Sequence, residues 1–538
     1  MKDRLDARYP TLISSEARQP PEVRHMTDDS LVAPVIEAST FSSIEVDKLF
    51  DSVNYARTRL GQATLYRSLR DPLSDFDLLK SKQDAVRELE HQPALRQQLE
   101  ALVKRAQARE QDLYHLLYGS FMGMFSSRAH ELELEGYGYG AYISGTQCLL
   151  DLVEGADHIQ GTQSAYLTAV LDRIRDFRSS RAYSLAKGPA YRTEKGIITR
   201  EEKRWYTPAI RFNPSLFKPV GLTLFILALL LAVEFVPLLL DMLASFASAL
   251  WLFLLPLGML YIPVVGGFDR DGCIYPLREI FRSSPELQRA LDGLGQLDEL
   301  LSFIHVREAF PHPMCLPELL DLPRHRLKVS EVRNPILAKE NANYVGNDID
   351  LTEARLTLIT GPNSGGKTAF CKTLAQVQLL AQIGGYVPAA SAQITVADRI
   401  DYQMPEISHL NDGEGRFGTE LRRTKEIFLA TTPRSFVIMD ELSEGTTHEE
   451  KIEISMAILE GFHQKGNNTL LITHNHELVD QMLGKGIGIA RQVEFLNDQP
   501  TYRVIEGISR VSHADRVARK IGFSKDDIAR YLAKDRQG

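Results

Sequence analysis

The run from Gly361 to Thr368 consists of residues that could bind a polyphosphate. Its sequence, Gly-Pro-Asn-Ser-Gly-Gly-Lys-Thr, fits the pattern G-x-x-x-x-G-K-[ST]. Glycines let backbone N–H groups approach phosphate oxygens, and a following helix adds its positive N-terminal end. Lys367 would neutralise the β- and γ-phosphates, and the Thr368 hydroxyl would ligate Mg²⁺. The candidate ATP-binding residues are Gly361, Pro362, Asn363, Ser364, Gly365, Gly366, Lys367, Thr368 and Ala369.

A second group of candidates follows two apolar stretches further along the chain. Residues 435–439 have the composition of a buried strand, and Asp440 and Glu441 come directly after them. Asp440 would hold Mg²⁺ together with Thr368, and Glu441 would polarise the attacking water. Residues 470–473 form another apolar stretch that ends at His474, where a γ-phosphate sensor would lie. The sequence therefore predicts Glu441, His474 and Lys367 as catalytic residues.

Each of these patterns also has a purely structural interpretation. The glycine run could be a turn, the two acids could be a solvated strand end, and His474 could be a packing residue. The surroundings favour the nucleotide site, because residues 356–360 are predicted as a strand and residues 369–383 as a helix. Strand, glycine loop and helix is the context that this motif requires. From about residue 319 onward strands and helices alternate, which predicts a mostly parallel sheet.

Length and composition indicate several domains with sizeable cores. The chain has 538 residues, 44% of them hydrophobic, with a net charge of -8 and a pI near 6.0. Because the net charge is negative, the chain as a whole lacks the positive charge that is typical of nucleic-acid-binding proteins, but a local basic patch stays possible. The charged N-terminus is unlike a signal peptide. The cysteines show no C-x-x-C spacing, which predicts free thiols in a reducing compartment; they are Cys148, Cys273, Cys315 and Cys371.

Residues 46–215 are predicted to be mainly helical, and their last part is rich in basic residues. Leucines recur at helical spacing between residues 78 and 102. Residues 172–204 contain ten lysines and arginines. Three interpretations stay open for this run: a solvated helix face, a positive zone beside a membrane, and a nucleic-acid contact.

Two long apolar runs follow, from Val220 to Leu240 and from Leu243 to Val265. Each is about long enough to cross the hydrocarbon core of a bilayer, and the short break between them predicts a helical hairpin. Basic residues on both sides place both flanks in the cytoplasm. We therefore expect contact with membrane lipid through residues 218–266 and a location at the cell inner membrane. The alternative is a buried helical hairpin in a soluble core.

At the nucleotide motifs the chain resembles the MutS family of ATPases. Residues 360–368 are similar to that family's TGPN-x-GGK loop, and Arg333-Asn334-Pro335 and Asn347-Asp348-Ile349 resemble the segments that lead to it. The family's signature serine aligns with Gly415. No mismatch-reading domain or long clamp is recognisable. The similar segments further along are 380–389, 439–441, 445–447, 473–478 and the tail 507–532.

The resemblance implies a fold, a dimer and a domain order. The expected fold class is an α/β P-loop ATPase domain of the ABC type, plus an α-helical lever domain interrupted by a transmembrane helical hairpin. A homodimer through the ATPase domains is expected. The predicted segments are an irregular arm (1–45), the lever (46–215), the hairpin (216–267), the returning helical domain (268–318), the ATPase domain (319–505) and a helical dimerisation segment (506–538).

The leading hypothesis is a membrane-tethered, Mg²⁺-dependent dimeric ATPase whose ATP binding and hydrolysis move the helical lever. A second hypothesis is a membrane-anchored DNA-binding protein of repair or recombination, which depends on the resemblance and on the basic run. The further alternatives are a transporter-type ATPase and a scaffold that binds nucleotide without turnover. The sequence does not decide whether DNA is bound.

Overall fold

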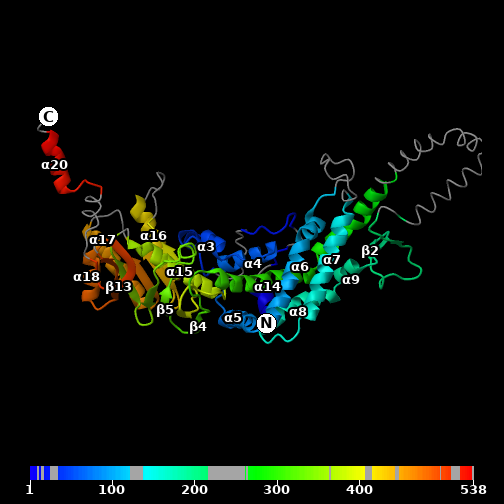
Figure 1. Ribbon diagram of the computed structural model, residues 1–538, viewed down its shortest axis with the longest axis horizontal. Helices are drawn as coiled ribbons and strands as arrows, with labels where there is room; N and C mark the ends of the chain where they lie inside the picture. The colour runs from blue at the N-terminus through cyan, green and yellow to red at the C-terminus, as the bar shows by residue number, and fades with distance from the viewer. Residues whose placement is uncertain are drawn as a thin grey trace, which may run out of the picture. The chain divides into compact units, whose positions relative to one another are not determined.

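The computed structural model (Figure 1) describes residues 1–8, 11–13, 17–24, 34–121, 137–215, 218, 261, 264–362, 365–405, 415–442, 448–496, 499–509 and 521–535. The chain divides into two compact units. Unit 1 comprises Met1–His25, Ala56–Thr64 and Glu88–Glu299. Unit 2 comprises Met26–Tyr55, Leu65–Arg87 and Leu300–Gly538. The domain boundaries expected from the sequence remain a prediction.

Unit 1 is mainly helical, with one small antiparallel sheet of strand order β2-β1-β3. Three helices contribute residues to both units, namely α4 (Arg59–Arg70), α5 (Phe76–His91) and α14 (Pro285–Ala309). The other helices of unit 1 are α1 (Lys2–Arg8), α6 (Pro93–Tyr118), α7 (Tyr139–His158), α8 (Ala165–Asp176), α9 (Arg181–Lys187) and α13 (Tyr275–Arg282). The strands are β1 (Tyr191–Thr193), β2 (Gly196–Ile198) and β3 (Ile210–Arg211).

Helices α6 and α7 lie side by side because each presents an apolar stripe to the other. Leu95, Leu99 and Leu102 recur at helical spacing and are buried on α6. On α7, Gly155 allows the close approach, since a Cβ there would lie 2.5 Å from a methyl carbon of Leu102. The pair forms the centre of the apolar core of unit 1.

Unit 2 contains two sheets. The larger has the strand order β13-β12-β7-β11-β10-β9, and the smaller has the order β4-β8-β5-β6. The strands are β4 (Glu318–Leu320), β5 (Leu327–Val332), β6 (Asn347–Asp350), β7 (Leu356–Thr360), β8 (Ser391–Thr395), β9 (Ile400–Gln403), β10 (Phe436–Asp440), β11 (Asn468–Ile472), β12 (Ile489–Leu496) and β13 (Gln499–Glu506). The helices are α2 (Ala38–Ser43), α3 (Val46–Val53), α5 (Phe76–His91), α15 (Lys367–Gln382), α16 (Gly415–Ala430), α17 (His448–Lys465), α18 (His476–Gly484) and α20 (Lys525–Asp535).

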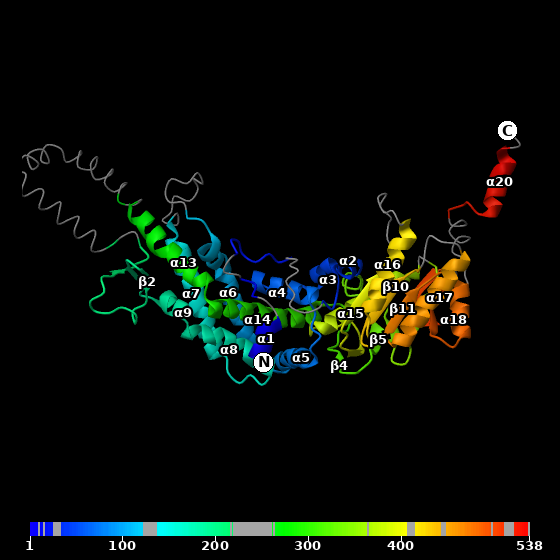
Figure 2. The same cartoon turned by 180° about the vertical axis from the view of Figure 1, so that it is seen from behind.

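The larger sheet is parallel except for the β12–β13 hairpin. Alternate residues of its central strands, such as Leu356 and Leu358, form one apolar core with α16, α17 and α18. Figures 1 and 2 show the sheet between α15 on one side and α17 and α18 on the other. Because β7, β10 and β11 run in one direction, the residues that follow them meet at one edge of the sheet.

Residues Met26–Tyr55 belong to unit 2, although they lie between two segments of unit 1 in the sequence. Ile36 forms a parallel bridge with Ile400 of β9, and helices α2 and α3 follow. Residues 34–45 lie in the stretch for which the sequence predicted an irregular arm. In the structure they extend the edge of the larger sheet.

The transmembrane hairpin expected from the sequence is not supported, and the predicted fold class is wrong on this point. Among the helices of the described ranges, none combines the length and apolar composition needed to cross a membrane. A span needs about 20 consecutive apolar residues. Helices α6 and α14, with 26 and 25 residues, are long enough but carry charged side chains along their length. Residues 219–260 of the expected hairpin lie outside the described residues.

Two further predictions depended on that hairpin and are corrected with it. They are the membrane-lipid contact through residues 218–266 and the location at the cell inner membrane. Both inferences were made from the length of the apolar runs alone. The described residues provide no spanning helix that would support either of them.

Candidate functional site

The glycine loop connects a fully buried strand of the large sheet to the helix that follows it. All five residues of β7 are buried, and α15 begins at Lys367. Gly361 and Gly366 have φ values of 135° and 86°, which side chains with a Cβ rarely adopt. The loop therefore turns sharply and brings the N-terminus of α15 to the end of β7. Asn363 and Ser364, two of the predicted loop residues, lie outside the described residues.

Lys367 is only 2% exposed, and its ammonium is held by the loop itself. Its Nζ donates to the carbonyl oxygens of Gly361 at 2.6 Å and Pro362 at 3.0 Å. It also lies 3.3 Å from Nε2 of His474, which must accept because an ammonium has no lone pair. Burial lowers the pKa of Lys367, while Glu441 and Asp440 counteract part of that effect. A bound phosphate would form an ion pair with this ammonium group.

Thr368 and Asp440 meet at the edge of the sheet. The Thr368 hydroxyl donates to Oδ2 of Asp440 at 2.9 Å, so two oxygen groups from α15 and β10 lie together beside the loop. Mg²⁺ prefers hard oxygen ligands and is usually bound through one or two carboxylates together with substrate phosphates. The donor set present here fits a Mg²⁺ ion that accompanies a triphosphate.

Glu441 has a backbone conformation that is unusual for a residue with a side chain. Its φ is 66°, and its N–H donates to the carbonyl oxygen of Ile472 at 2.9 Å. Its carboxylate accepts from the N–H of His474 at 3.1 Å and from the Thr473 hydroxyl at 3.4 Å. Strained φ values of this kind persist where surrounding contacts impose them, often at functional sites. The carboxylate is thus held between β10 and β11.

The five predicted residues therefore form one cluster. They come from the ends of the neighbouring strands β10 and β11 and from the start of α15; the residues are Lys367, Thr368, Asp440, Glu441 and His474. The Nε2 atom of His474 lies 3.7 Å from Oε1 of Glu441 as well as near Lys367. A γ-phosphate beside Lys367 would thus be within reach of both an imidazole and a carboxylate.

A pocket of about 320 Å³ adjoins the loop at Gly365, Gly366 and Ala369. Tyr344 and Tyr502 contribute aromatic rings to its wall, and ring faces of this kind can stack on a nucleobase. The lining residues are Val332, Asn334, Leu337, Asn341, Asn343, Tyr344, Val345, Asn347, Gly365, Gly366, Ala369, Phe370, Thr373, Tyr502 and Val504.

Asn347 fixes one side of this pocket. Its side chain donates to the carbonyl oxygen of Tyr502 at 3.0 Å and accepts from the N–H of Val504 at 2.7 Å. These two contacts join β6 to β13, and they support Tyr502 in its left-handed conformation with φ of 60°. The pocket has the size and position for the nucleoside of a nucleotide whose phosphates occupy the loop.

Comparison with known proteins agrees with this geometry. The family model for MutS domain V matches residues 357–534. The DNA mismatch repair protein MutS of Desulforamulus reducens is 32% identical over 253 residues, which cover 45% of this chain and 29% of that protein. Residues 357–534 of this chain are therefore similar to MutS domain V. The MutS of Chloroflexus aurantiacus is 34% identical over 218 residues, covering 38% of this chain and 22% of its own length.

The similarity extends to eukaryotic MutS relatives. The DNA mismatch repair protein msh3 of Aspergillus fumigatus is 33% identical over 262 residues, covering 45% of this chain and 22% of its own length. In all three cases the match spans less than a third of the relative. This chain thus matches only a part of each relative, and the family model places the similarity to MutS domain V at residues 357–534.

Sequence reasoning missed the aromatic wall of the nucleoside pocket. The segment at Asn347 had been associated with the nucleotide site, but Tyr344 and Tyr502 were not predicted. Tyr502 lies on β13, which a hairpin returns to the loop from far along the chain. No local pattern could reveal that contact.

Proposed function

We propose that this chain is a Mg²⁺-dependent ATPase of the MutS type. One observation carries the proposal: a buried lysine, a Thr–Asp oxygen pair and a held glutamate surround the end of a glycine loop. Lys367, Thr368 and Glu441 each contact a second predicted residue of the cluster. The adjoining pocket supplies room for a nucleoside.

The residues of the site would have distinct roles. The loop amides of residues 361–366 and the Lys367 ammonium bind the β- and γ-phosphates. Thr368 and Asp440 hold the metal, and bound Mg²⁺ would neutralise the charge on the phosphate oxygens. Glu441 accepts a proton from the attacking water, and His474 contacts the γ-phosphate. Tyr344 and Tyr502 enclose the base.

The relatives extend the proposal to partners. They are named as DNA mismatch repair proteins. We infer that this chain acts as a homodimer through its ATPase domains, with DNA as its macromolecular partner. The exposed apolar residues Phe523, Ile528 and Leu532 at α20 support a helical contact between two copies.

The proposal is tested by phosphate release from the purified full chain with ATP, with and without Mg²⁺. Turnover is expected with the metal only. Lys367→Ala should abolish ATP binding and hence turnover. The control Lys485→Ala removes an exposed lysine paired with Glu460 on the surface of the same unit, and it should leave turnover unchanged. Equal turnover in Lys367→Ala and the parent chain would refute the assignment.

One surface of unit 1 favours a direct contact with single-stranded DNA. The basic run at residues 172–204 separates into two parts in the structure. Arg173, Arg175 and Arg178 are engaged with acidic side chains or backbone carbonyls of unit 1. The loop between β2 and β3 instead presents Trp205, which is 95% exposed. Its exposed basic neighbours are Arg200, Lys203 and Arg204.

Exposed aromatic rings among cations bind single strands by base stacking and phosphate contacts. Trp205→Ala and the triple change of Arg200, Lys203 and Arg204 to Gln should both weaken binding of an oligothymidylate. Only the triple change should reduce the salt dependence of binding. Unchanged binding in both variants would exclude this loop as a DNA contact.

A further inference from the structure

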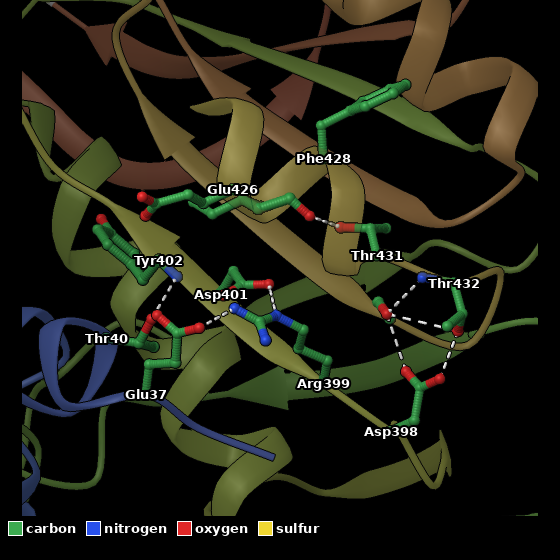
Figure 3. A network of polar contacts seen from close by, with 12 residues as sticks. Glu37, Thr40, Asp398, Arg399, Asp401, Tyr402, Glu426, Phe428, Thr431 and Thr432 are labelled. Atoms are coloured by element: carbon green, nitrogen blue, oxygen red, sulfur yellow. Dashed lines mark hydrogen bonds and ion pairs between the residues drawn. The ribbon is translucent and has the colours of Figure 1, made fainter. Parts of the chain in front are cut away.

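The strongest unexplained feature of unit 2 is the network at Glu37, in the segment that precedes α2. Oε1 of Glu37 accepts from Arg399, and Oε2 accepts from Arg423 at 2.5 Å. Arg399 directs its Nε to Oδ2 of Asp401 at 2.7 Å (Figure 3). The carboxylates of Glu37, Asp401 and Glu426 therefore form one ion-pair network with the two guanidinium groups. Burial would raise the pKa of Glu37, but its bonds to Arg399 and Arg423 outweigh burial and lower it.

The cluster joins β9 to α16 at the level of the first residues of β10, because Ile400 lies opposite Phe436. Arg399 and Asp401 flank the first residue of β9, whereas Arg423 lies on α16. The next residue of α16, Thr424, contacts Gln403 of β9 at 2.9 Å. Strand β9 pairs with β10 so that Gln403 lies opposite Met439, the residue before Asp440. A shift of β9 or α16 would therefore reach the metal-side carboxylate through one strand pair.

The backbone of the same segment also contacts β9. The N–H of Ile400 donates to the carbonyl oxygen of Val35 at 2.8 Å, and the N–H of Tyr402 donates to the Thr40 hydroxyl at 3.1 Å (Figure 3). The pKa of Tyr402 is raised by burial first, and then by the neighbouring Cys371 and Asp440.

The continuation of the segment contacts the other side of the nucleotide site. The side-chain amide of Gln376, on α15, donates to the carbonyl oxygen of Ile44 at 2.8 Å. The Ser52 hydroxyl donates to the carbonyl oxygen of Pro335 at 2.6 Å, next to the pocket residue Asn334. Residues 34–53, which we name the strap, therefore connect β9 and α16 with α15 and the nucleoside pocket.

We propose that Glu37 is a positioning residue for ATP hydrolysis, acting through Arg399 and Arg423 to hold β9 and α16 against the acidic strand end. The inference rests on the proposed ATPase function. Partly buried ion pairs add little net stability, since desolvation offsets their attraction. The main effect of this network is therefore on geometry, and hydrolysis is sensitive to displacements of about 1 Å.

The test compares Glu37→Gln, Arg423→Met and the double variant in the full chain. The readouts are the kcat for Mg²⁺–ATP, the Kd of a non-hydrolysable ATP analogue and the thermal unfolding midpoint. Glu37→Gln should lower kcat about tenfold or more and change Kd by less than about twofold. The double variant should be no slower than the slower single variant, because both changes break one contact. Glu37→Asp, which keeps the charge, should recover part of the rate.

A matched control removes a surface ion pair elsewhere. Lys2→Gln breaks the exposed pair with Asp176 in unit 1 and should leave kcat unchanged. A kcat in Glu37→Gln equal to that of the parent chain would overturn the proposal. A lower kcat and a weaker Kd that change in proportion to a lower unfolding midpoint would overturn it as well. Failure of both single variants to fold would assign Glu37 to stability and overturn it too. An inactive parent chain would instead refute the ATPase function itself.

Discussion

At the scale of single residues, the lysine proposed to bind phosphate is hydrogen-bonded by its own loop. Lys367 donates to two carbonyl oxygens that face the same space a phosphate would occupy. Those bonds keep a buried ammonium from being an uncompensated charge. Nucleotide binding would exchange them for charge-assisted bonds, which are stronger. The loop is therefore arranged for a polyphosphate before one arrives.

His325 is a buried neutral histidine whose protonation state follows from its neighbours. The amide nitrogen of Gln378 donates to Gln382 and to the carbonyl oxygen of Thr395, so its Oε1 must accept from Nε2 of His325 at 3.1 Å. The imidazole also stacks on Phe436, with ring centroids 4.8 Å apart. Burial lowers the pKa of His325 to about 4.

This shift predicts that unit 2 loses stability in mild acid. The unfolded chain takes up a proton near the ordinary pKa of 6.5, whereas the folded chain does so only near 4. The free energy of unfolding should therefore fall as pH drops from about 6.5 to 4, by up to about 3 kcal/mol. Denaturant unfolding of His325→Gln should show a smaller fall over that range. An identical pH profile in the variant and the parent chain would contradict the assignment.

Some residues of the candidate site could be predicted from the sequence, and others could not. Gly361 to Thr368, Asp440, Glu441 and His474 were predictable because each lies in a short contiguous pattern after an apolar strand. Tyr344 and Tyr502 were not, since their place beside the loop depends on the pairing of β6, β12 and β13. Glu37 was not either, because its partners lie more than 360 residues further along the chain.

At the scale of elements, the start of α4 depends on one buried carboxylate. Asp298 of α14 accepts from the N–H of Thr58 at 2.7 Å and from its hydroxyl at 2.8 Å. The Thr58 hydroxyl in turn accepts from the N–H of Gly61 at 2.9 Å and caps the helix. A Cβ at Gly61 would lie 2.2 Å from Oδ2 of Asp298. The glycine leaves room for the carboxylate.

Gly61→Ala should therefore destabilise unit 1 by about 1–3 kcal/mol, because the Asp298 carboxylate must move away from Thr58. Alanine is more favourable than glycine in a helix by about 1 kcal/mol, so helix propensity alone would make the variant more stable. A loss of stability would therefore point to the displaced carboxylate. Gly267→Ala, where a Cβ would meet nothing within 4 Å, is the matched control and should be neutral or stabilising. Thermal unfolding of both variants measures the difference. Equal unfolding midpoints in the two variants would show that Asp298 is not displaced.

Elements also show where sequence reasoning reached its limit. Alternating strands and helices after residue 319 were readable, because β7, α15, β10 and β11 are each a compact apolar pattern. Residues 1–45 were predicted to be an irregular arm because they are polar with scattered prolines, and the bridge within the strap forms only when Ile36 meets Ile400. The apolar runs after residue 219 predicted a membrane hairpin from length alone, and the helices that the structure does describe provide no span.

At the scale of the whole molecule, the proposed homodimer predicts a role for α20. Ile528 and Leu532 lie four residues apart on one face of this helix and are 37% and 57% exposed in the single chain. Changing both to Asp should weaken self-association about 30-fold or more, since two apolar side chains would leave the contact. Sedimentation equilibrium measures the dimer constant. Lys525→Asp alters charge on the same helix and should change it little; an unaltered constant in the double variant would exclude α20 from the dimer contact.

The central claim is that Glu441 activates water at a bound Mg²⁺–ATP. The most direct measurement is the nucleotide retained by purified Glu441→Gln and parent protein after one incubation with Mg²⁺–ATP, together with their turnover. We predict that the variant binds ATP with parent-like affinity and retains it unhydrolysed, while the parent chain releases phosphate repeatedly. Parent-like turnover in Glu441→Gln would contradict the account.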